Sequence, residues 1–396
     1  SARQAELAVF VEGDVEDQRA LLEADGRYHA NCFSAAAGLF WRAQCVWPTV
    51  SGGVARSRAA VFAMTGQTLR VRCAVPPDAA CSASPRPASV RELGAAFALD
   101  VEGQASLRVR LSARSRGRPG GRGAGPRVAI CVGVRFKADD IATEYPDALV
   151  DWLQYHYRAG VGRFYLYDTD GSLSKHLPSW MVRAGIIAYH PKFPARFGRM
   201  ADLSSQGWPQ CTEVLAYDHC LYHNMGEADW IHVLHSFDVY TFVPDWASLQ
   251  SPAPLAGLFE PSNVHRSAPI IPRVLERIGQ RAANSTGRPV CGIFIRQLDF
   301  GGPREPSSHL ARSFSFRKNK TWPDPYHRGD PALAADGSAF YAEGHRMVCR
   351  RGWGAAVSGV DELRVNHYKD AFKSMAPRGL GGRCRVRDDS IYALVP

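Results

Sequence analysis

The chain has 396 residues, of which 45% are hydrophobic and 22% charged. This ordinary globular balance can bury a large core in two or three domains. The net charge of +10 would suit a polyanionic partner, but no nucleic-acid-binding motif accompanies it, so we expect no nucleic-acid partner. No run of about 18 apolar residues occurs, which excludes an ordinary membrane-spanning helix.

The first 112 residues are predicted to be all-β. Short apolar segments alternate with Gly, Pro and Ser clusters, and this spacing predicts a β-sandwich. The expected strands cover residues 8–11, 37–41, 60–64, 69–75, 95–101 and 106–111. Trp41 and Trp47 flank Cys45, where aromatic rings usually belong to the core. The functional alternative is a flat platform on which a sugar ring stacks.

Residues 113–126 consist mainly of Gly, Pro and Arg. Such a segment cannot bury apolar area, so we predict a flexible linker here. We place the domain boundary at this linker, which leaves residues 127–396 as the second domain.

The second domain begins with alternating strand and helix patterns. Strands are expected at 128–134, 163–167 and 186–189, and helices at 147–159, 177–184 and 212–224. This order predicts a parallel sheet with right-handed crossovers. No GxGxxG follows the first strand and no GxxxxGK[ST] occurs, which argues against a dinucleotide-binding fold and a P-loop. The last third is less regular, with strands expected at 290–295, 313–316, 338–341 and 363–367, and a helix at 273–280.

A carboxylate, Asp238, interrupts the apolar stretch 228–245, which we expect to form one buried strand. Burying an unpaired charge costs several kcal/mol, so a cation or donor should lie beside it. Ligands bind at the carboxyl ends of strands in open α/β sheets. Asp238 is therefore either a structural carboxylate at a strand end or a ligand for a metal and a diphosphate.

The chain has ten cysteines and no CxxC pair, which argues against a zinc ribbon. Two triplets, Asn284-Ser285-Thr286 and Asn319-Lys320-Thr321, fit the acceptor pattern for N-glycosylation. Together these features favour a secretory compartment with disulfides. The pairing of the cysteines cannot be read from the sequence.

An ordered set of motifs resembles glycosyltransferase family 92. The opening of that family is similar to Asp151-Trp152 with His156, followed by the run from Gly160 to Asp168. Later matches are Asp218-His219-Cys220-Leu221, Gly344-His345 and Asn366-His367-Tyr368. In the first domain, Asn31-Cys32-Phe33-Ser34, Gln44-Cys45-Val46-Trp47 and the run from Val71 to Pro76 resemble the carbohydrate-binding module of plant β-1,4-galactan synthases.

The resemblance implies a GT-A domain, meaning a Rossmann-like α/β fold with a mostly parallel sheet, behind the β-sandwich. It also implies a nucleotide-sugar donor, UDP-galactose above all, a glycan acceptor such as β-1,4-galactan, inverting transfer and Mn²⁺. The expected location is the Golgi lumen, as a type II membrane protein whose N-terminal anchor is absent from this chain. A homodimer is left open.

One departure from the family concerns the metal site. The family's Asp-x-Asp-Glu-Tyr positions read Ser236-Phe237-Asp238-Val239-Tyr240, so one aspartate and the glutamate are replaced. We predict Asp238 and His367 as metal ligands, since Mn²⁺ accepts carboxylate and imidazole. His235 and Ser236 are helpers, Ser236 on the donor side. The thinner ligand set leaves open a metal-independent enzyme, or an inactive relative that only binds sugar.

The remaining roles are assigned from the chemistry of glycosyl transfer, which needs a base, a nucleotide slot and charge neutralisation. Asp299 is the predicted base, with Glu343 and Asp361 as alternatives. Arg135 and Asp168 are predicted in the nucleotide slot, although an Asp-Thr-Asp-Gly turn would also explain Asp168. Lys369 is a predicted diphosphate contact. The basic cluster Arg312, Arg317 and Lys318 is either a solvated face or a further set of diphosphate contacts.

Three functions follow in order of preference. The first is a glycosyltransferase that extends a galactan or a similar glycan. The second is a glycan-binding protein without catalysis, and the third is a polyanion binder that acts through the arginines of the linker.

Overall fold

The computed structural model describes most of the chain. The described residues are 4–10, 44–65, 68–74, 76–77, 96–100, 107–110, 127–135, 137–193, 210–225, 227–244, 269–302, 304, 307, 309–314, 316–318, 329–343, 346–368, 371 and 386–387.

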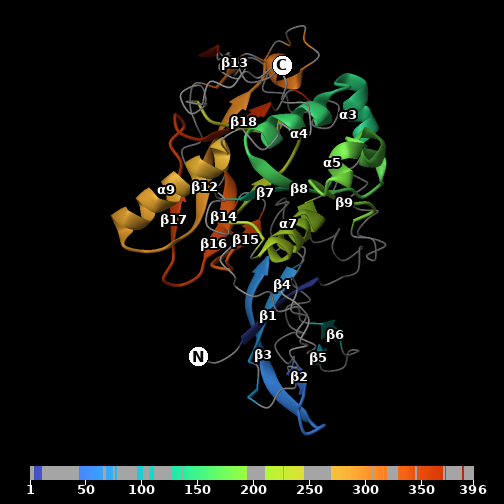
Figure 1. The fold of residues 1–396 in the computed structure, drawn as a ribbon, viewed down its shortest axis with the longest axis vertical. Coiled ribbons are helices and arrows are strands. Elements are labelled where there is room, and N and C mark those ends of the chain that lie inside the picture. The colour runs from blue at the N-terminus through green and yellow to red at the C-terminus, as the bar shows by residue number, and fades with distance from the viewer. Residues whose placement is uncertain are drawn as a thin grey trace, which may run out of the picture.

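A curled, mixed sheet forms the centre of the second domain (Figure 1). Its main path runs β11-β18-β12-β14-β10-β7-β8-β9. These strands are β11 (Val239–Phe242), β18 (Arg364–Tyr368), β12 (Val290–Phe300), β14 (Asp330–Ala334), β10 (Trp230–Leu234), β7 (Val128–Val132), β8 (Val161–Tyr167) and β9 (Ile187–His190). The strands from β10 to β9 pair in parallel, as predicted. Three short strands, β13 (Phe316–Arg317), β17 (Gly354–Val357) and β19 (Val386–Arg387), lie off this path.

Both faces of the sheet are covered, which explains why its first strand is apolar throughout. Val128, Ile130 and Val132 of β7 enter one core, while Ala129 and Cys131 enter the other. The first core contains helices α3 (Ala138–Glu144), α4 (Ala148–Arg158), α5 (Ser179–Arg183) and α9 (Ile270–Thr286). The second core contains α7 (Gln210–Asn224) and the hairpin of β15 (Ala339–Glu343) and β16 (Arg346–Cys349). The result is a three-layered α/β domain.

The helices predicted from apolar spacing are confirmed, with one extended. α4 begins after Asp147 and ends at Arg158, followed by the cap residue Ala159 and by Gly160 at φ +96°. α9 begins at Ile270, before Pro272, and not after it as predicted. Proline is tolerated in the first turn of a helix because backbone N–H groups in that turn have no intrahelical carbonyl partner, so no hydrogen bond is lost.

The stretch 228–245 was predicted as one strand, and this prediction is wrong. It forms β10 and β11, which lie at different places in the sheet, joined by residues 235–238. β10 pairs with β7 and β14, whereas β11 pairs with β18. Both strands are rich in apolar and β-branched residues. The hydrophobic periodicity alone therefore could not reveal that the chain leaves one part of the sheet after β10 and enters another at β11. Asp238 therefore lies in the turn immediately before β11.

The last third contains longer strands than predicted. β12 extends to Phe300, so Asp299 lies within a strand rather than after one. The strand expected at 313–316 is β13, which begins at Phe316. β14 was not predicted, and it is antiparallel to both β10 and β12. The sheet is therefore mixed but mostly parallel, and the expectation of a mostly parallel sheet is confirmed.

The first domain was predicted as a sandwich, but its described residues form one antiparallel sheet in the order β1-β4-β3-β2-β5-β6. Its strands are β1 (Gln4–Phe10), β2 (Gln44–Pro48), β3 (Val54–Thr65), β4 (Thr68–Ala74), β5 (Ala96–Asp100) and β6 (Leu107–Arg110). In this part of the chain no second packed sheet is described. The expected strand at 37–41 and the linker 113–126 lie outside the described residues.

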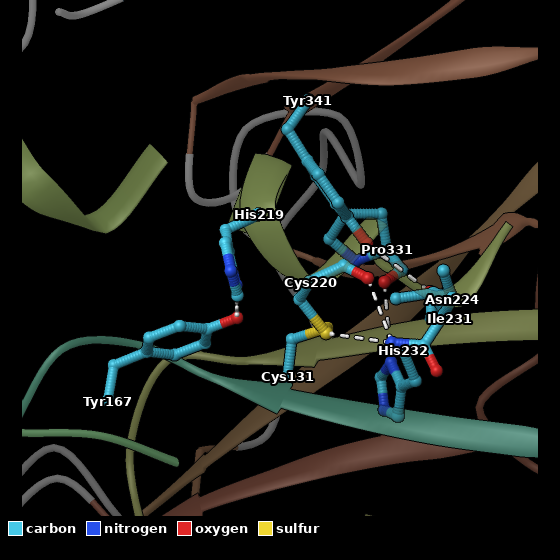
Figure 2. The surroundings of a disulfide bond; sticks show 9 residues. All are labelled: Cys131, Tyr167, His219, Cys220, Asn224, Ile231, His232, Pro331 and Tyr341. Atoms are coloured by element: carbon cyan, nitrogen blue, oxygen red, sulfur yellow. Dashed lines mark hydrogen bonds between the residues drawn. A yellow bond between two sulfur atoms is a disulfide. The ribbon is translucent and has the colours of Figure 1, made fainter. Parts of the chain in front are cut away.

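Three disulfides join described cysteines: Cys45–Cys73, Cys131–Cys220 and Cys291–Cys349. They agree with the predicted oxidising compartment. Figure 2 shows how Cys131–Cys220 joins β7 to α7, with Tyr167 of β8 in contact with His219 next to it. None of the described helices is long and apolar enough to cross a membrane.

Removing Cys131–Cys220 is expected to destabilise the second domain. The bond closes a chain segment with a sequence separation of 89 residues. A Cys131→Ser/Cys220→Ser double variant should lose about 2–5 kcal/mol of unfolding free energy, because its unfolded state regains conformational freedom. Urea unfolding of both proteins without reductant measures the difference. An unchanged unfolding midpoint would contradict the expectation.

Candidate functional site

Three predicted site residues meet at the carboxyl edge of the curled sheet. Within β18, His367 pairs with Val239 of β11 on one side and with Asp299 of β12 on the other. The Tyr368 N–H donates to the Asp238 carbonyl at 2.8 Å, which fixes the turn before β11 against β18. Backbone register therefore brings Asp238, His367 and Asp299 together from distant parts of the sequence.

Asp238 and His367 form the centre of this cluster. His367 Nε2 lies 3.4 Å from Asp238 Oδ2, and Asp238 is only 7% exposed. Burial alone would raise the pKa of Asp238, but His367, His235 and the Ser236 hydroxyl together lower it to about 2. The other oxygen, Oδ1, is buried and meets no donor of good geometry in the described part of the chain. Asp238 is thus an ionised carboxylate with one buried oxygen that accepts no hydrogen bond of good geometry from the described residues.

Asp330, which was not predicted from the sequence, contacts the Asp238–His367 pair indirectly, through His235. It begins β14, is fully buried, and its Oδ1 lies 3.0 Å from His235 Nδ1. The His235 ring packs against the His367 ring with centroids 4.7 Å apart. Burial lowers the pKa of His235, but the carboxylates of Asp330 and Asp238 outweigh this and raise it above its usual value. Asp330 therefore orients the histidine that borders the Asp238–His367 pair.

Asp299 belongs to a second hydrogen-bonded group on the same edge. Its Oδ2 accepts from Lys318 Nζ at 2.7 Å, and its Oδ1 accepts from Gln297 Nε2. Gln297 Nε2 also lies 3.1 Å from His367 Nδ1, so it joins Asp299 to the first pair. The predicted cation Lys318 is thus in the cluster, and Arg317 contacts the Lys318 carbonyl.

The predicted nucleotide slot lies at the ends of β7 and β8, where Arg135 and Asp168 form an isolated parallel bridge. Arg135 Nη2 lies 4.0 Å from Glu213 Oε1 on α7. Glu213 Oε1 also accepts a hydrogen bond from Tyr217. Glu213 contributes to the raised pKa of His235, so this group lies within electrostatic reach of the first cluster.

Asp168 has a structural role that its turn sequence had suggested. Its carboxylate accepts from Tyr189 Oη at 2.6 Å and from the backbone N–H groups of Leu173 and Gly171. These bonds close the turn after β8. Both oxygens of the Asp168 carboxylate already accept hydrogen bonds within the protein, so a nucleotide would have to share them.

No contact joins the other predicted residues to the cluster within the described part of the chain, and some of them lie outside that part. Trp47 is fully buried beside the Cys45–Cys73 disulfide, so it exposes no face on which a sugar could stack. Asp361 lies exposed in a turn, and Arg312 lies in a 3₁₀ turn. Trp41 and Lys369 lie outside the described residues, as does the side chain of Glu343.

Mn²⁺ fits the donor chemistry here in part. Asp238 offers a carboxylate oxygen that accepts no hydrogen bond of good geometry from the described residues, and His367 offers an imidazole; both ligand types suit the ion. Across the described residues, no group of three or more His, Cys, Asp and Glu side chains is arranged to hold a metal. Oxygens of a bound diphosphate and water would have to complete the coordination.

The chain was also compared with known proteins. No family model matches it, and no curated protein is significantly similar to it. The candidate site therefore rests on its own geometry and on the motifs quoted above.

A substitution at Gly133 tests how closely side chains pack around the predicted nucleotide slot beside Arg135 and Glu213. A Cβ at this position would overlap Glu213 Oε1 and lie 2.8 Å from Tyr217 Oη. Gly133→Ala is therefore expected to cost about 1–3 kcal/mol of unfolding free energy, since the ends of the Glu213 and Tyr217 side chains must move and their hydrogen bond is disturbed. Gly162→Ala is the matched control, because its nearest atom is 3.8 Å away. Thermal unfolding compares the two, and equal effects would show that the slot is loosely packed.

Proposed function

We propose that residues 127–396 are a glycosyltransferase domain of the GT-A type, which transfers a hexose with inversion from a nucleotide-sugar donor to a glycan. The observation that carries this proposal is the buried, ionised Asp238 beside His367 at the carboxyl edge of an α/β sheet, with one oxygen that accepts no hydrogen bond of good geometry from the described residues. The motif resemblance narrows the donor to UDP-galactose and the acceptor to β-1,4-galactan or a related glycan.

The donor diphosphate would lie over Asp238 and His367. Mn²⁺ bound by these two residues would neutralise the charge that develops on the leaving diphosphate. Arg135 and Lys318 are cations of the same edge and could face phosphate oxygens. Ser236 is half-buried and remains the proposed residue on the donor side. Its hydroxyl would have to exchange its bond to Asp238 for one to the sugar or its phosphate, because it has a single proton to donate.

The acceptor hydroxyl needs a base that removes its proton as the new bond forms. Asp299 is the proposed base, because it is connected to His367 through the side chain of Gln297. The Gln297 amide nitrogen donates to Asp299 Oδ1 and lies 3.1 Å from His367 Nδ1. Lys318 and Gln297 fix the orientation of its carboxylate. An acceptor hydroxyl would have to approach within hydrogen-bond distance of Asp299 Oδ1 or Oδ2, both of which already accept internal donors.

For the rest of the protein, we propose that the first domain is a carbohydrate-binding module and that the chain acts in the Golgi lumen. The antiparallel sheet and the three disulfides support these assignments at the level of architecture and redox compartment. A membrane anchor and a homodimer remain expectations from the resemblance.

The proposal is tested by UDP release from UDP-galactose and from other UDP-sugars, with galacto-oligosaccharide acceptors and with or without Mn²⁺. Calorimetric titration with UDP measures donor-site affinity independently of the acceptor. Turnover with one donor is expected. A chain that neither binds UDP nor releases it from any donor would refute the proposal.

A second candidate is a glycan-binding relative without catalysis. It is favoured by Ser236 and Val239, which stand where the family carries carboxylates. Binding of galactan oligosaccharides by the full chain, together with no affinity for UDP, would support this alternative. Measurable UDP affinity would exclude it.

A further inference from the structure

The last turn of α9 extends beyond the core of the domain. The buried residues of this helix all lie between Ile270 and Gly279, and the partly buried Ala282 is the last that packs against the core. Residues 284–289, which contain the end of the helix and the turn after it, are all exposed. The helix ends at Thr286 and is followed by Gly287, whose φ of +65° suits the left-handed cap. The structure therefore presents this end of α9 to solvent.

The exposed turn contains the triplet Asn284-Ser285-Thr286. Asparagine followed two residues later by threonine is the acceptor pattern for N-linked glycans, and it must be on the surface to accommodate the bulk of the sugar. The disulfides Cys131–Cys220 and Cys291–Cys349 are typical of a chain that folds where such glycans are added. Sequence pattern, exposure and redox chemistry thus agree at one position.

The position of Asn284 also keeps it away from the candidate site. α9 packs on β12 and β17, and β12 starts at Val290, four residues after the helix ends. The end of α9 is therefore near the amino end of β12, while Asp299 is near its carboxyl end. Figure 1 shows the outer end of α9 on the side of the sheet away from β13 and β18. A glycan at Asn284 would leave the carboxyl edge open.

We propose that Asn284 carries an N-linked glycan. The Asn284 amide nitrogen forms a bond to the anomeric carbon of an oligosaccharide on a polyisoprenyl diphosphate. The bond from that carbon to the diphosphate breaks, the diphosphate leaves, and the amide loses one proton to a base of the transferring enzyme. The inference is independent of the proposed glycosyltransferase activity.

The test uses the full chain, secreted from a eukaryotic cell that glycosylates its products. Intact mass and digestion with a peptide N-glycosidase should reveal a glycan on the peptide that contains Asn284. Asn284→Gln and Thr286→Ala should both remove it, while Ser285→Ala and Thr286→Ser should retain it, because only the first and third positions define the acceptor. UDP affinity of Asn284→Gln should equal that of the wild type.

The second triplet provides the comparison. Asn319 directly follows Lys318, whose ammonium contacts Asp299 in the candidate site. Asn319→Gln is expected to leave the Asn284 glycan in place. An unmodified Asn284 in the recovered chain would overturn the proposal, whether the chain is secreted with its disulfides or retained in the cell. A glycan that disappears only in Asn319→Gln would overturn it equally.

Discussion

Replacing Asp238 by Asn is expected to reduce glycosyl transfer by roughly 10²-fold or more. Asparagine keeps the size of the side chain but removes the negative charge that His367 and His235 surround. Under the proposed function, this charge is required to hold Mn²⁺ against the leaving diphosphate. Initial rates of UDP release, and UDP titrations with and without Mn²⁺, measure the effect.

The same substitution should change the acid stability of the fold. The pKa of Asp238 in the folded protein is about 2, below the usual 3.8. Its ionised form therefore stabilises the fold above pH 4, by on the order of 2 kcal/mol, and this contribution disappears as the pH falls from about 4 to 2. Asp238→Asn should remove this part of the acid transition, whereas the exposed Asp361→Asn should leave it unchanged. Urea unfolding at pH 3, 4 and 7 makes the comparison, and identical profiles for both variants would contradict it.

Replacing Asp330 by Asn is expected to cost roughly 3 kcal/mol of unfolding free energy at pH 7. Asp330 is fully buried, and the substitution leaves the protonated form of His235 without its carboxylate. Urea unfolding measures the loss, and Asp361→Asn again serves as the exposed control.

A double-mutant cycle with His235→Gln isolates the contact between the two side chains. We expect a coupling energy of about 1–3 kcal/mol between Asp330 and His235, because each is the other's direct partner at 3.0 Å. A coupling near zero would mean that Asp330 stabilises the sheet without orienting His235. It would then have no positioning role in the site.

The sequence predicted the part of the fold that depends on local patterns. α4 and its neighbouring strands have apolar spacing and end signals within a few residues, so their position could be read directly. β14 could not be predicted in this way. It begins Asp330-Pro331 and continues Ala332-Leu333-Ala334, in which both alanines, the aspartate and the proline have low strand propensity. It is held by β10 and β12 from other parts of the chain.

In the candidate site, too, residues within local sequence patterns could be predicted, whereas a residue placed by long-range strand pairing could not. Asp238 and His367 stood out because a motif order and an apolar context surrounded them, and the structure places them 3.4 Å apart. Asp330 did not stand out, because an aspartate before a proline is typical of an exposed turn. Only the pairing of β14 inside the sheet shows that this carboxylate is buried.

The short connection between β10 and β11 has a geometric consequence for the whole edge. In strand order these two are four neighbours apart, or about 19 Å across a flat sheet. The five steps from Leu234 to Val239 reach at most about 18 Å when fully extended, and residues 237–238 form a turn. The sheet must therefore roll inward, and the rings of His235 and His367 meet at 4.7 Å although two strands separate β10 from β18. Shortening this connection by a single residue would tighten the roll and move both imidazoles at once.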